Sequence, residues 1–274
     1  MRLLGLVVAV VALAGAAGCR GDGRGGGREL VAAFYPLAWA AQQVAGPGAR
    51  VTDLTPAGAE PHDLELSPRD VERVQDADLV VYAGGGFQPA VEEAVAGRAG
   101  PSYDVARGAA DPHVWLDPLR FAAVVEELAE RLGRAGSAYG VVRRLRRLHG
   151  EYRRGLARCE RRTIVTVHAA FGHLARRYGL VQLALAGRAP EAEPGPRELE
   201  RLVRAIQDAG ATTVFAEPLV SDRLARTVAR EAGARVAVLD PLEGLSEERR
   251  AAGADYVSVM RDNLAALREA LGCR

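Results

Sequence analysis

The chain alternates between short apolar runs and longer segments whose apolar residues lie three and four positions apart. Short runs of branched apolar residues are typical of buried strands, and the wider spacing is typical of helices with one buried face. Strands alternating with helices pair in parallel, so the pattern predicts an α/β fold. Strands are expected at residues 30–34, 50–54, 79–82, 163–167, 181–186, 213–216 and 235–239.

The strands fall into two groups, with only helical patterns between them. One helix is expected to start at Pro118, and an arginine-rich helix is expected to follow it, ending near residue 157. We therefore predict two lobes, each a parallel sheet flanked by helices, at residues 29–135 and 159–274, joined by a connecting helix at residues 136–158. Other helices are expected at residues 37–44, 68–75, 89–95, 171–178, 196–209, 222–231 and 254–271.

The N-terminal segment has the pattern of an export signal. A basic start precedes apolar residues 3–14, a run too short for a typical membrane span. Small residues and then Cys19 follow, as in a lipobox, in which Cys19 would be acylated and become the first mature residue. Ala16, three positions before the cut, leaves plain signal cleavage as an alternative. We expect a lipoprotein signal peptide over residues 1–19 and a flexible Gly/Arg-rich tether over residues 20–28.

Export changes how the remaining cysteines are interpreted. Besides Cys19 the chain has only Cys159 and Cys273, and such a pair in an oxidising compartment predicts a disulfide. Two free thiols are the alternative. The protein is expected outside the cytoplasm, held to the membrane by a lipid on Cys19, and monomeric. The formal net charge of +1 argues against nucleic acid as a partner.

Three of the five histidines and one carboxylate are candidate metal ligands. His62 follows the second predicted strand, His168 and Asp240 end two later strands, and His113 lies in the motif Asp-Pro-His-Val-Trp-Leu-Asp-Pro. Parallel sheets bind ligands at the carboxyl ends of their strands, so the four side chains are expected to meet in one cleft. Three imidazoles and a carboxylate complete a four-coordinate Zn²⁺ shell, which leaves no open position for a catalytic water. For each histidine alone, a structural or surface role is the alternative, and for Asp240 alone it is a turn residue before Pro241.

These residues lie in five longer motifs. They are Gly-Ala-Glu-Pro-His62-Asp, Asp-Pro-His113-Val-Trp-Leu-Asp-Pro, Val-Thr-Val-His168-Ala-Ala-Phe-Gly, Phe215-Ala-Glu217-Pro and Leu-Asp240-Pro-Leu. Together the motifs resemble those of the solute-binding proteins of zinc/manganese ABC transporters, the long-helix cluster A-I type. The resemblance implies metal ligation by His62, His113, His168 and Asp240, two lobes joined by a long rigid helix, and a permease with its ATPase as the recipient of the metal.

The third ligand position bears on the choice of metal. In manganese members the resemblance implies a carboxylate at this position, whereas this chain has His168. A nitrogen-richer set of ligands favours Zn²⁺ over the harder Mn²⁺. We therefore expect Zn²⁺ as the transported ligand and no enzymatic activity. A Mn²⁺-binding member of the same family, a secreted zinc hydrolase and a lipoprotein adhesin are the alternatives.

Two further residues near the predicted cleft need an interpretation. Glu217 ends a strand and is expected to hold a ligand histidine in one tautomer, with an ion pair to an arginine as the alternative. In the hydrolase alternative, Glu217 would be the general base. His173 stands where the resemblance implies an aromatic residue, and we expect it to be a helix residue close to the cleft, with a residue that supports a ligand or an accessory ligand as the alternative.

Overall fold

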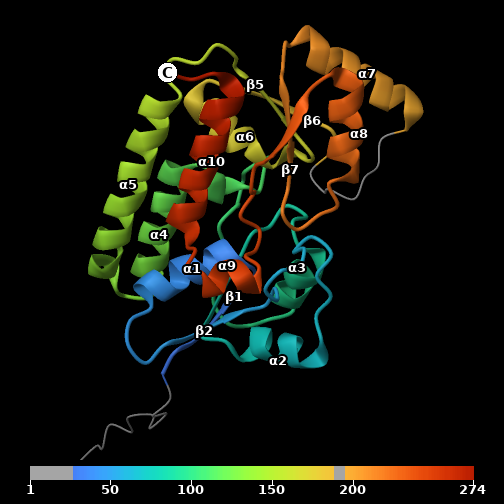
Figure 1. Ribbon diagram of the computed structural model, residues 1–274. Coiled ribbons are helices and arrows are strands. Elements are labelled where there is room, and N and C mark those ends of the chain that lie inside the picture. The colour runs from blue at the N-terminus through green and yellow to red at the C-terminus, as the bar shows by residue number, and fades with distance from the viewer. Residues whose placement is uncertain (1–26, 188–194) are drawn as a thin grey trace, which may run out of the picture.

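The computed structural model describes residues 27–187 and 195–274, which form two α/β lobes stacked one above the other (Figure 1). The predicted signal peptide, Cys19 and most of the predicted tether lie outside the described residues. Within these residues, none of the helices combines the length and the apolar character needed to cross a bilayer.

The first lobe is built on a four-stranded parallel sheet with the order β2-β1-β3-β4. Leu30 of β1 lies opposite Val51 of β2 on one side and Leu79 of β3 on the other. The strands are β1 (Glu29–Ala32), β2 (Arg50–Asp53), β3 (Leu79–Tyr82) and β4 (Ser102–Asp104), and the helices between them are α1 (Tyr35–Val44), α2 (Pro68–Asp76) and α3 (Pro89–Ala96).

The second lobe repeats this topology with the order β6-β5-β7-β8, again all parallel. Val165 of β5 lies opposite Leu183 of β6 and Val214 of β7. The strands are β5 (Thr163–Thr166), β6 (Val181–Ala184), β7 (Thr213–Ala216) and β8 (Arg235–Val238), and the helices are α6 (Gly172–Tyr178), α7 (Pro196–Asp208), α8 (Arg223–Ala232), α9 (Glu247–Ala251) and α10 (Tyr256–Leu271). The expected fold class, two lobes of parallel sheet flanked by helices, is confirmed.

A helical hairpin and the last helix connect the two lobes. The hairpin consists of α4 (Pro118–Arg131) and α5 (Ala138–Gly155), and α10 packs against α5 (Figure 1). Asp117 accepts hydrogen bonds from backbone N–H groups of the first turn of α4, and Asp255 forms a reciprocal capping box with Ser258 at the start of α10. The caps fix where these helices begin and therefore where the preceding loops end.

One apolar core spans the boundary between the lobes. Trp39 of α1 stacks on Phe121 of α4 and on Tyr256 of α10, with ring centroids 5.9 and 5.0 Å apart. Trp115 is fully buried, donates from Nε1 to Pro241 O at 2.8 Å and accepts at its carbonyl from the Tyr256 hydroxyl at 2.5 Å. The loop after β4 is therefore held directly against the loop after β8.

Two elements were not predicted by the hydrophobic pattern. Strand β4 has only three residues, and the sequence Ser-Tyr-Asp carries no apolar run. Helix α9 has five residues, Glu-Glu-Arg-Arg-Ala, without an apolar stripe, and begins where the Ser246 side chain accepts from Arg249 N. Both elements are short and polar, so neither has the apolar periodicity by which a strand or a helix is predicted from sequence.

The predicted disulfide between Cys159 and Cys273 is confirmed, with the two residues separated by 114 positions. Backbone hydrogen bonds surround it: Arg274 N donates to Arg158 O at 2.9 Å, and Arg161 N donates to Leu271 O at 3.0 Å. The bond fastens the end of α10 to the chain that enters β5.

We expect the double variant Cys159→Ser/Cys273→Ser to fold but to lose about 2–5 kcal/mol of unfolding free energy, because closing so long a loop restricts the unfolded chain. Chemical unfolding monitored by circular dichroism measures the loss. A reductant should destabilise the wild type and leave the double variant unchanged. Equal midpoints for the wild type and the variant would contradict a stabilising role.

Candidate metal site

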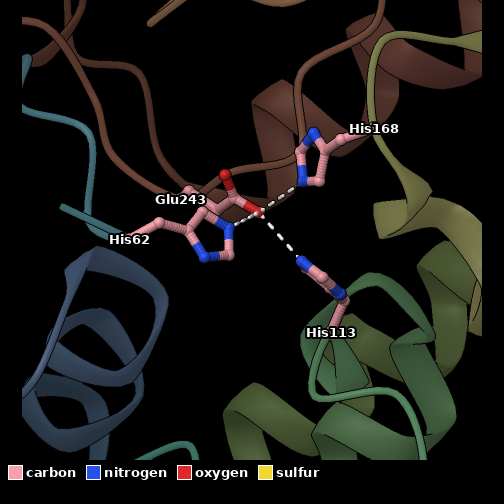
Figure 2. Close-up of side chains that lie close together, drawn as sticks. All are labelled: His62, His113, His168 and Glu243. Carbon is pink, nitrogen blue, oxygen red and sulfur yellow. Dashed lines mark hydrogen bonds and ion pairs between the residues drawn. The ribbon is translucent and has the colours of Figure 1, made fainter. Parts of the chain in front are cut away.

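Three histidines and one glutamate meet between the lobes, at the carboxyl ends of the strands. His62 lies in the loop after β2, His113 in the loop after β4, His168 directly after β5, and Glu243 in the loop after β8. One potential ligand atom from each lies within 4.8 Å of all the others, and Figure 2 shows the three rings turned toward the Glu243 carboxylate. The structure thus brings together the three histidines that the sequence singled out.

The three distances from Glu243 to the imidazoles are close to the edge length of a coordination tetrahedron. Glu243 Oε1 lies 3.2 Å from the Nε2 atoms of both His113 and His168, and 3.7 Å from His62 Nε2. Ligand bonds of about 2.0–2.2 Å around a tetrahedral Zn²⁺ imply donor–donor separations of roughly 3.4 Å. All four atoms lie within 4.8 Å of one another, so the separations that exceed the tetrahedral edge must shorten by at most about 1.4 Å for all four to reach one ion.

Carboxylates behind two of the rings fix which nitrogen faces the cluster. His113 Nδ1 is 2.8 Å from Asp111 Oδ1, and His168 Nδ1 is 2.7 Å from Glu217 Oε2. Glu217 also accepts from the backbone N–H of His168 at 3.2 Å. When Nδ1 donates to a carboxylate, Nε2 is left as a free lone pair, which is the arrangement that histidine ligands of metals commonly have.

The buried nitrogens of the cluster are not satisfied by protein alone. Among the described residues, His62 Nε2 and His113 Nε2 are buried and make no well-aligned hydrogen bond, although Glu243 Oε1 lies 3.7 and 3.2 Å from them. His113, His168 and Glu243 are at most 1 % exposed at their side chains. Because buried polar atoms are costly without a partner, two such lone pairs aimed at one carboxylate fit a bound cation.

The fourth member of the cluster is Glu243, and not Asp240 as predicted from the sequence. The Asp240 carboxylate lies elsewhere: Oδ2 pairs with Arg249 Nη1 at 2.5 Å, and Oδ1 accepts from Leu242 N at 2.7 Å. Burial raises the pKa of Asp240 to about 6, against the opposing effects of the Leu242 N–H group and Arg249. Asp240 therefore shapes the loop that carries Glu243.

The turn between Asp240 and Glu243 explains why Glu243 reaches the cluster and Asp240 does not. Leu242 has φ of 57°, in the left-handed region that residues other than glycine seldom adopt. Asn263 clamps the start of the turn, accepting from Asp240 N at 2.9 Å and donating to Asp240 O at 2.7 Å. The chain turns sharply after β8, so Glu243, five residues past the end of the strand and three past Asp240, reaches the cluster.

The carboxylates of the site differ in how clearly the sequence indicates them. Asp111 stands two residues before His113, the spacing at which a carboxylate can meet both the ring and the backbone N–H of that histidine. Glu217 was expected to hold a ligand histidine, and the structure places it against His168. Glu243 had no signal that separates it from Asp240, because both acids follow the same strand.

His173 lies on α6 beside the cluster rather than in it. Its Nε2 donates to Asp111 O at 2.8 Å, while its Nδ1 accepts from Arg176 Nη2 at 3.0 Å. Both ring nitrogens are thus occupied within the protein. His149, the fifth histidine, lies on α5, where Nδ1 is 3.2 Å from the Tyr178 hydroxyl.

Carboxylates control the protonation of the cluster. Burial alone would lower the pKa of His168, but the charge of Glu243 and the hydrogen bond to Glu217 outweigh it and raise the pKa to about 11. Burial is likewise outweighed at His113, whose pKa is raised by Asp111 and Glu243. Burial would raise the pKa of Glu243, but His168 and the other two rings hold it well below its ordinary value. At neutral pH the metal-free cluster therefore holds a proton that a metal ion must displace.

The fold and this site define a class of two-lobed proteins that bind a ligand between parallel-sheet lobes. The family model described as zinc-uptake complex component A, periplasmic, matches residues 30–270. The chain belongs to this family.

Known relatives agree with this assignment. The chain is 32 % identical over 284 residues to zinc-binding protein AdcA of Streptococcus pyogenes serotype M6, a match that covers 88 % of this chain and 55 % of that protein. The chain thus spans about half the length of this curated relative.

Two solved structures share the fold. The laminin-binding protein Lmb of Streptococcus agalactiae, described as bifunctional with adhesin and metal-transporting activity, superposes with a TM-score of 0.81 at 29 % identity, covering 89 % of this chain and all of that one. The Zn(II)-bound ZnuA-like domain of Streptococcus pneumoniae AdcA superposes with a TM-score of 0.75 at 34 % identity, covering 90 % of this chain and 99 % of that one.

A matched pair of substitutions tests which acid serves the cluster. Glu243→Gln should weaken Zn²⁺ binding by more than about a hundredfold, because it removes the only carboxylate among the four candidate ligands. Asp240→Asn keeps the shape of the turn and should weaken binding by about tenfold at most. Competition against a chromogenic chelator measures both. If Asp240→Asn weakened binding more than Glu243→Gln, Asp240 would be the carboxylate ligand.

Proposed function

We propose that the protein captures Zn²⁺ outside the cytoplasm and delivers it to an ABC importer. The observation that carries this proposal is the convergence of the buried Nε2 atoms of His62 and His113 on the Glu243 carboxylate, where neither makes a well-aligned hydrogen bond among the described residues. Membership of the zinc-uptake family supports the same conclusion. The cation is cargo in this proposal, so reversible binding rather than catalysis is the role of the site.

The donor set supports Zn²⁺ in preference to Mn²⁺. Three imidazole nitrogens and one carboxylate oxygen make a nitrogen-rich set, whereas Mn²⁺ is better suited by oxygen donors. Four protein donors fill a tetrahedral shell, whereas catalytic zinc sites keep a position for water or substrate. Glu217, the candidate base of a hydrolase, is committed to His168 at 2.7 Å.

The route of delivery follows from the family and from the N-terminal sequence. We propose a permease and its ATPase as the recipient, and a lipid on Cys19 as the anchor that keeps the protein at the membrane. A periplasmic family supports extracytoplasmic action. A pneumococcal relative, 32 % identical over 310 residues, is named zinc-binding lipoprotein AdcA, which supports the anchor.

Metal content and competition test the proposed cargo. The wild type should bind one Zn²⁺ per chain, and excess Mn²⁺ should not displace it. His168→Ala should bind Zn²⁺ at least about a hundredfold more weakly, since losing a ligand exceeds losing its outer partner. Mass spectrometry of metal content and chelator competition provide the measurements.

His149→Ala is the matched control, because it removes an imidazole that lies on α5 outside the cluster. It should keep full Zn²⁺ affinity. Preference for Mn²⁺ would assign the protein to manganese transport, and the absence of stoichiometric metal at neutral pH would refute the proposal.

The dependence of Zn²⁺ affinity on pH should extend well above the ordinary histidine range. Because the pKa of His168 is raised to about 11, binding must displace a proton throughout the neutral range. Affinity should therefore rise by about tenfold per pH unit from pH 6 to 8. Calorimetry in buffers of different ionisation enthalpy counts the released protons.

Glu217→Gln provides the control for this pH profile, because it removes one of the carboxylates that raise the pKa of His168. Its affinity should level off at a lower pH than that of the wild type. A wild-type profile that is flat above about pH 7, the range expected for an ordinary imidazole, would contradict the expectation.

A further inference from the structure

Helix α5 concentrates positive charge to a degree that no other described helix approaches. Its 18 residues include six arginines and one glutamate, a net charge of +5, whereas the whole chain carries only +1. On α7, by contrast, three arginines are balanced by three acids. The high arginine content of the chain therefore does not by itself explain the excess positive charge on α5.

Three of the α5 arginines form an exposed row without ion pairs. Arg143, Arg147 and Arg154 are spaced four and seven positions apart, which places them along one face of the helix, and all three are exposed. The apolar face is buried on the opposite side, at Val141, Val142, Leu145, Leu148 and Tyr152. Within the described part of the chain, none of the three is paired with a carboxylate; Arg143 lies over the Tyr139 ring, 5.7 Å from its centroid.

Two of the other three arginines of α5, and its glutamate, are paired with neighbouring helices; the third, Arg153, is exposed and has no ion pair among the described residues. Arg144 pairs with Asp255 at 2.6 Å, and Arg146 pairs with Glu126 at 3.2 Å. Glu151 is held by Arg261 through two contacts of 2.9 Å. The acids of α4 and α10 therefore engage neighbours of the row, while the row itself, Arg143, Arg147 and Arg154, faces outward.

The N-terminal chain leaves the folded lobe at the beginning of this helix. Arg28 Nη1 donates to Leu132 O at 2.5 Å, and Gly27 lines one hollow together with Gly133 and Arg134 of the α4–α5 turn. Cys19 lies eight positions before Gly27, a reach of at most about 29 Å from Gly27 when extended. Helix α5 has 18 residues and is about 27 Å long, so this reach from Gly27 is comparable to the length of the helix.

We propose that the arginine row docks against the surface of an anionic phospholipid bilayer. Guanidinium groups bind phosphate oxygens through paired hydrogen bonds and are weakly hydrated, which suits them to lipid headgroups. Helix α5 runs along one edge of the molecule, away from α7 and α8 (Figure 1). Docking would hold the long axis of α5 against the membrane and give the anchored protein one orientation. The proposed anchor accounts for the nearness of α5 to the membrane, and the inference rests on it in that respect. The attraction of the arginine row to anionic lipid does not depend on the anchor.

Chemical modification of arginine tests the docked surface in the full processed chain. Phenylglyoxal is applied to protein on phosphatidylcholine vesicles with and without phosphatidylglycerol, and modified residues are quantified by mass spectrometry. Arg143, Arg147 and Arg154 should react at least about fivefold more slowly on the anionic vesicles, the factor expected for one arginine at such a surface. Salt at 1 M, where the Debye length is about 3 Å, should restore their reactivity. Arg197 and Arg201 of α7 should react equally on both vesicles.

Paired variants provide the matched control. Arg143→Gln/Arg154→Gln should abolish the protection of Arg147, whereas Arg197→Gln/Arg201→Gln, with the same change of charge, should preserve it. Both variants alter exposed residues far from the metal cluster and should keep full Zn²⁺ affinity.

The outcomes separate this inference from the proposed anchor. A chain that fails to float with neutral vesicles lacks the anchor, yet protection of the row on anionic vesicles would still support docking. Equal reactivity of the row on both vesicle types, with or without flotation, would overturn docking. Protection that requires transporter in the vesicles would also overturn it, by assigning the row to a protein partner.

Discussion

The Glu243 carboxylate, buried among three imidazoles, is the interaction on which the rest of the architecture depends. An ionised carboxylate costs several kcal/mol to bury unless cations or donors surround it. Here its partners come from both lobes, since His62 and His113 belong to the first and His168 to the second. The three loops that carry the histidines each present a group that this buried carboxylate requires.

The surrounding structure limits how that cluster can open. Trp115 and Tyr256 join the loop of His113 to the loop of Glu243 through buried hydrogen bonds, and one apolar core continues across the lobe boundary. Separating the lobes as rigid bodies would expose this core, at about 25 cal/mol for each square ångström of apolar surface. Displacing the loop of His113 or of His168 would also break the contact that Asp111 or Glu217 makes with the outer ring nitrogen of that histidine.

The sequence predicted the parts of the molecule whose signals are local. Strand and helix periodicity identified both sheets, and the scarcity of histidine made the three clustered rings conspicuous. The missed features depend on tertiary context. Strand β4 is too short and polar to show a period, and the choice of Glu243 over Asp240 follows from the left-handed conformation of Leu242 and the clamp by Asn263. The local sequence does not predict that Leu242 adopts φ of 57°, because the surrounding structure imposes this conformation.

Either a proton or a metal ion can offset the negative charge that the carboxylates bring to the cluster. Glu243, Glu217 and Asp111 bring three carboxylates to the cluster, and burial makes their uncompensated charge unfavourable. Without metal, a proton on His168 supplies part of the missing positive charge, which is why its pKa is raised despite burial. A divalent cation supplies that charge more completely while freeing the imidazole lone pair. The carboxylates that orient the rings for metal are thus the same groups that retain a proton in its absence. A site built in this way can give up its ion without leaving a buried negative charge unpaired, because a proton from solvent replaces the ion as it departs.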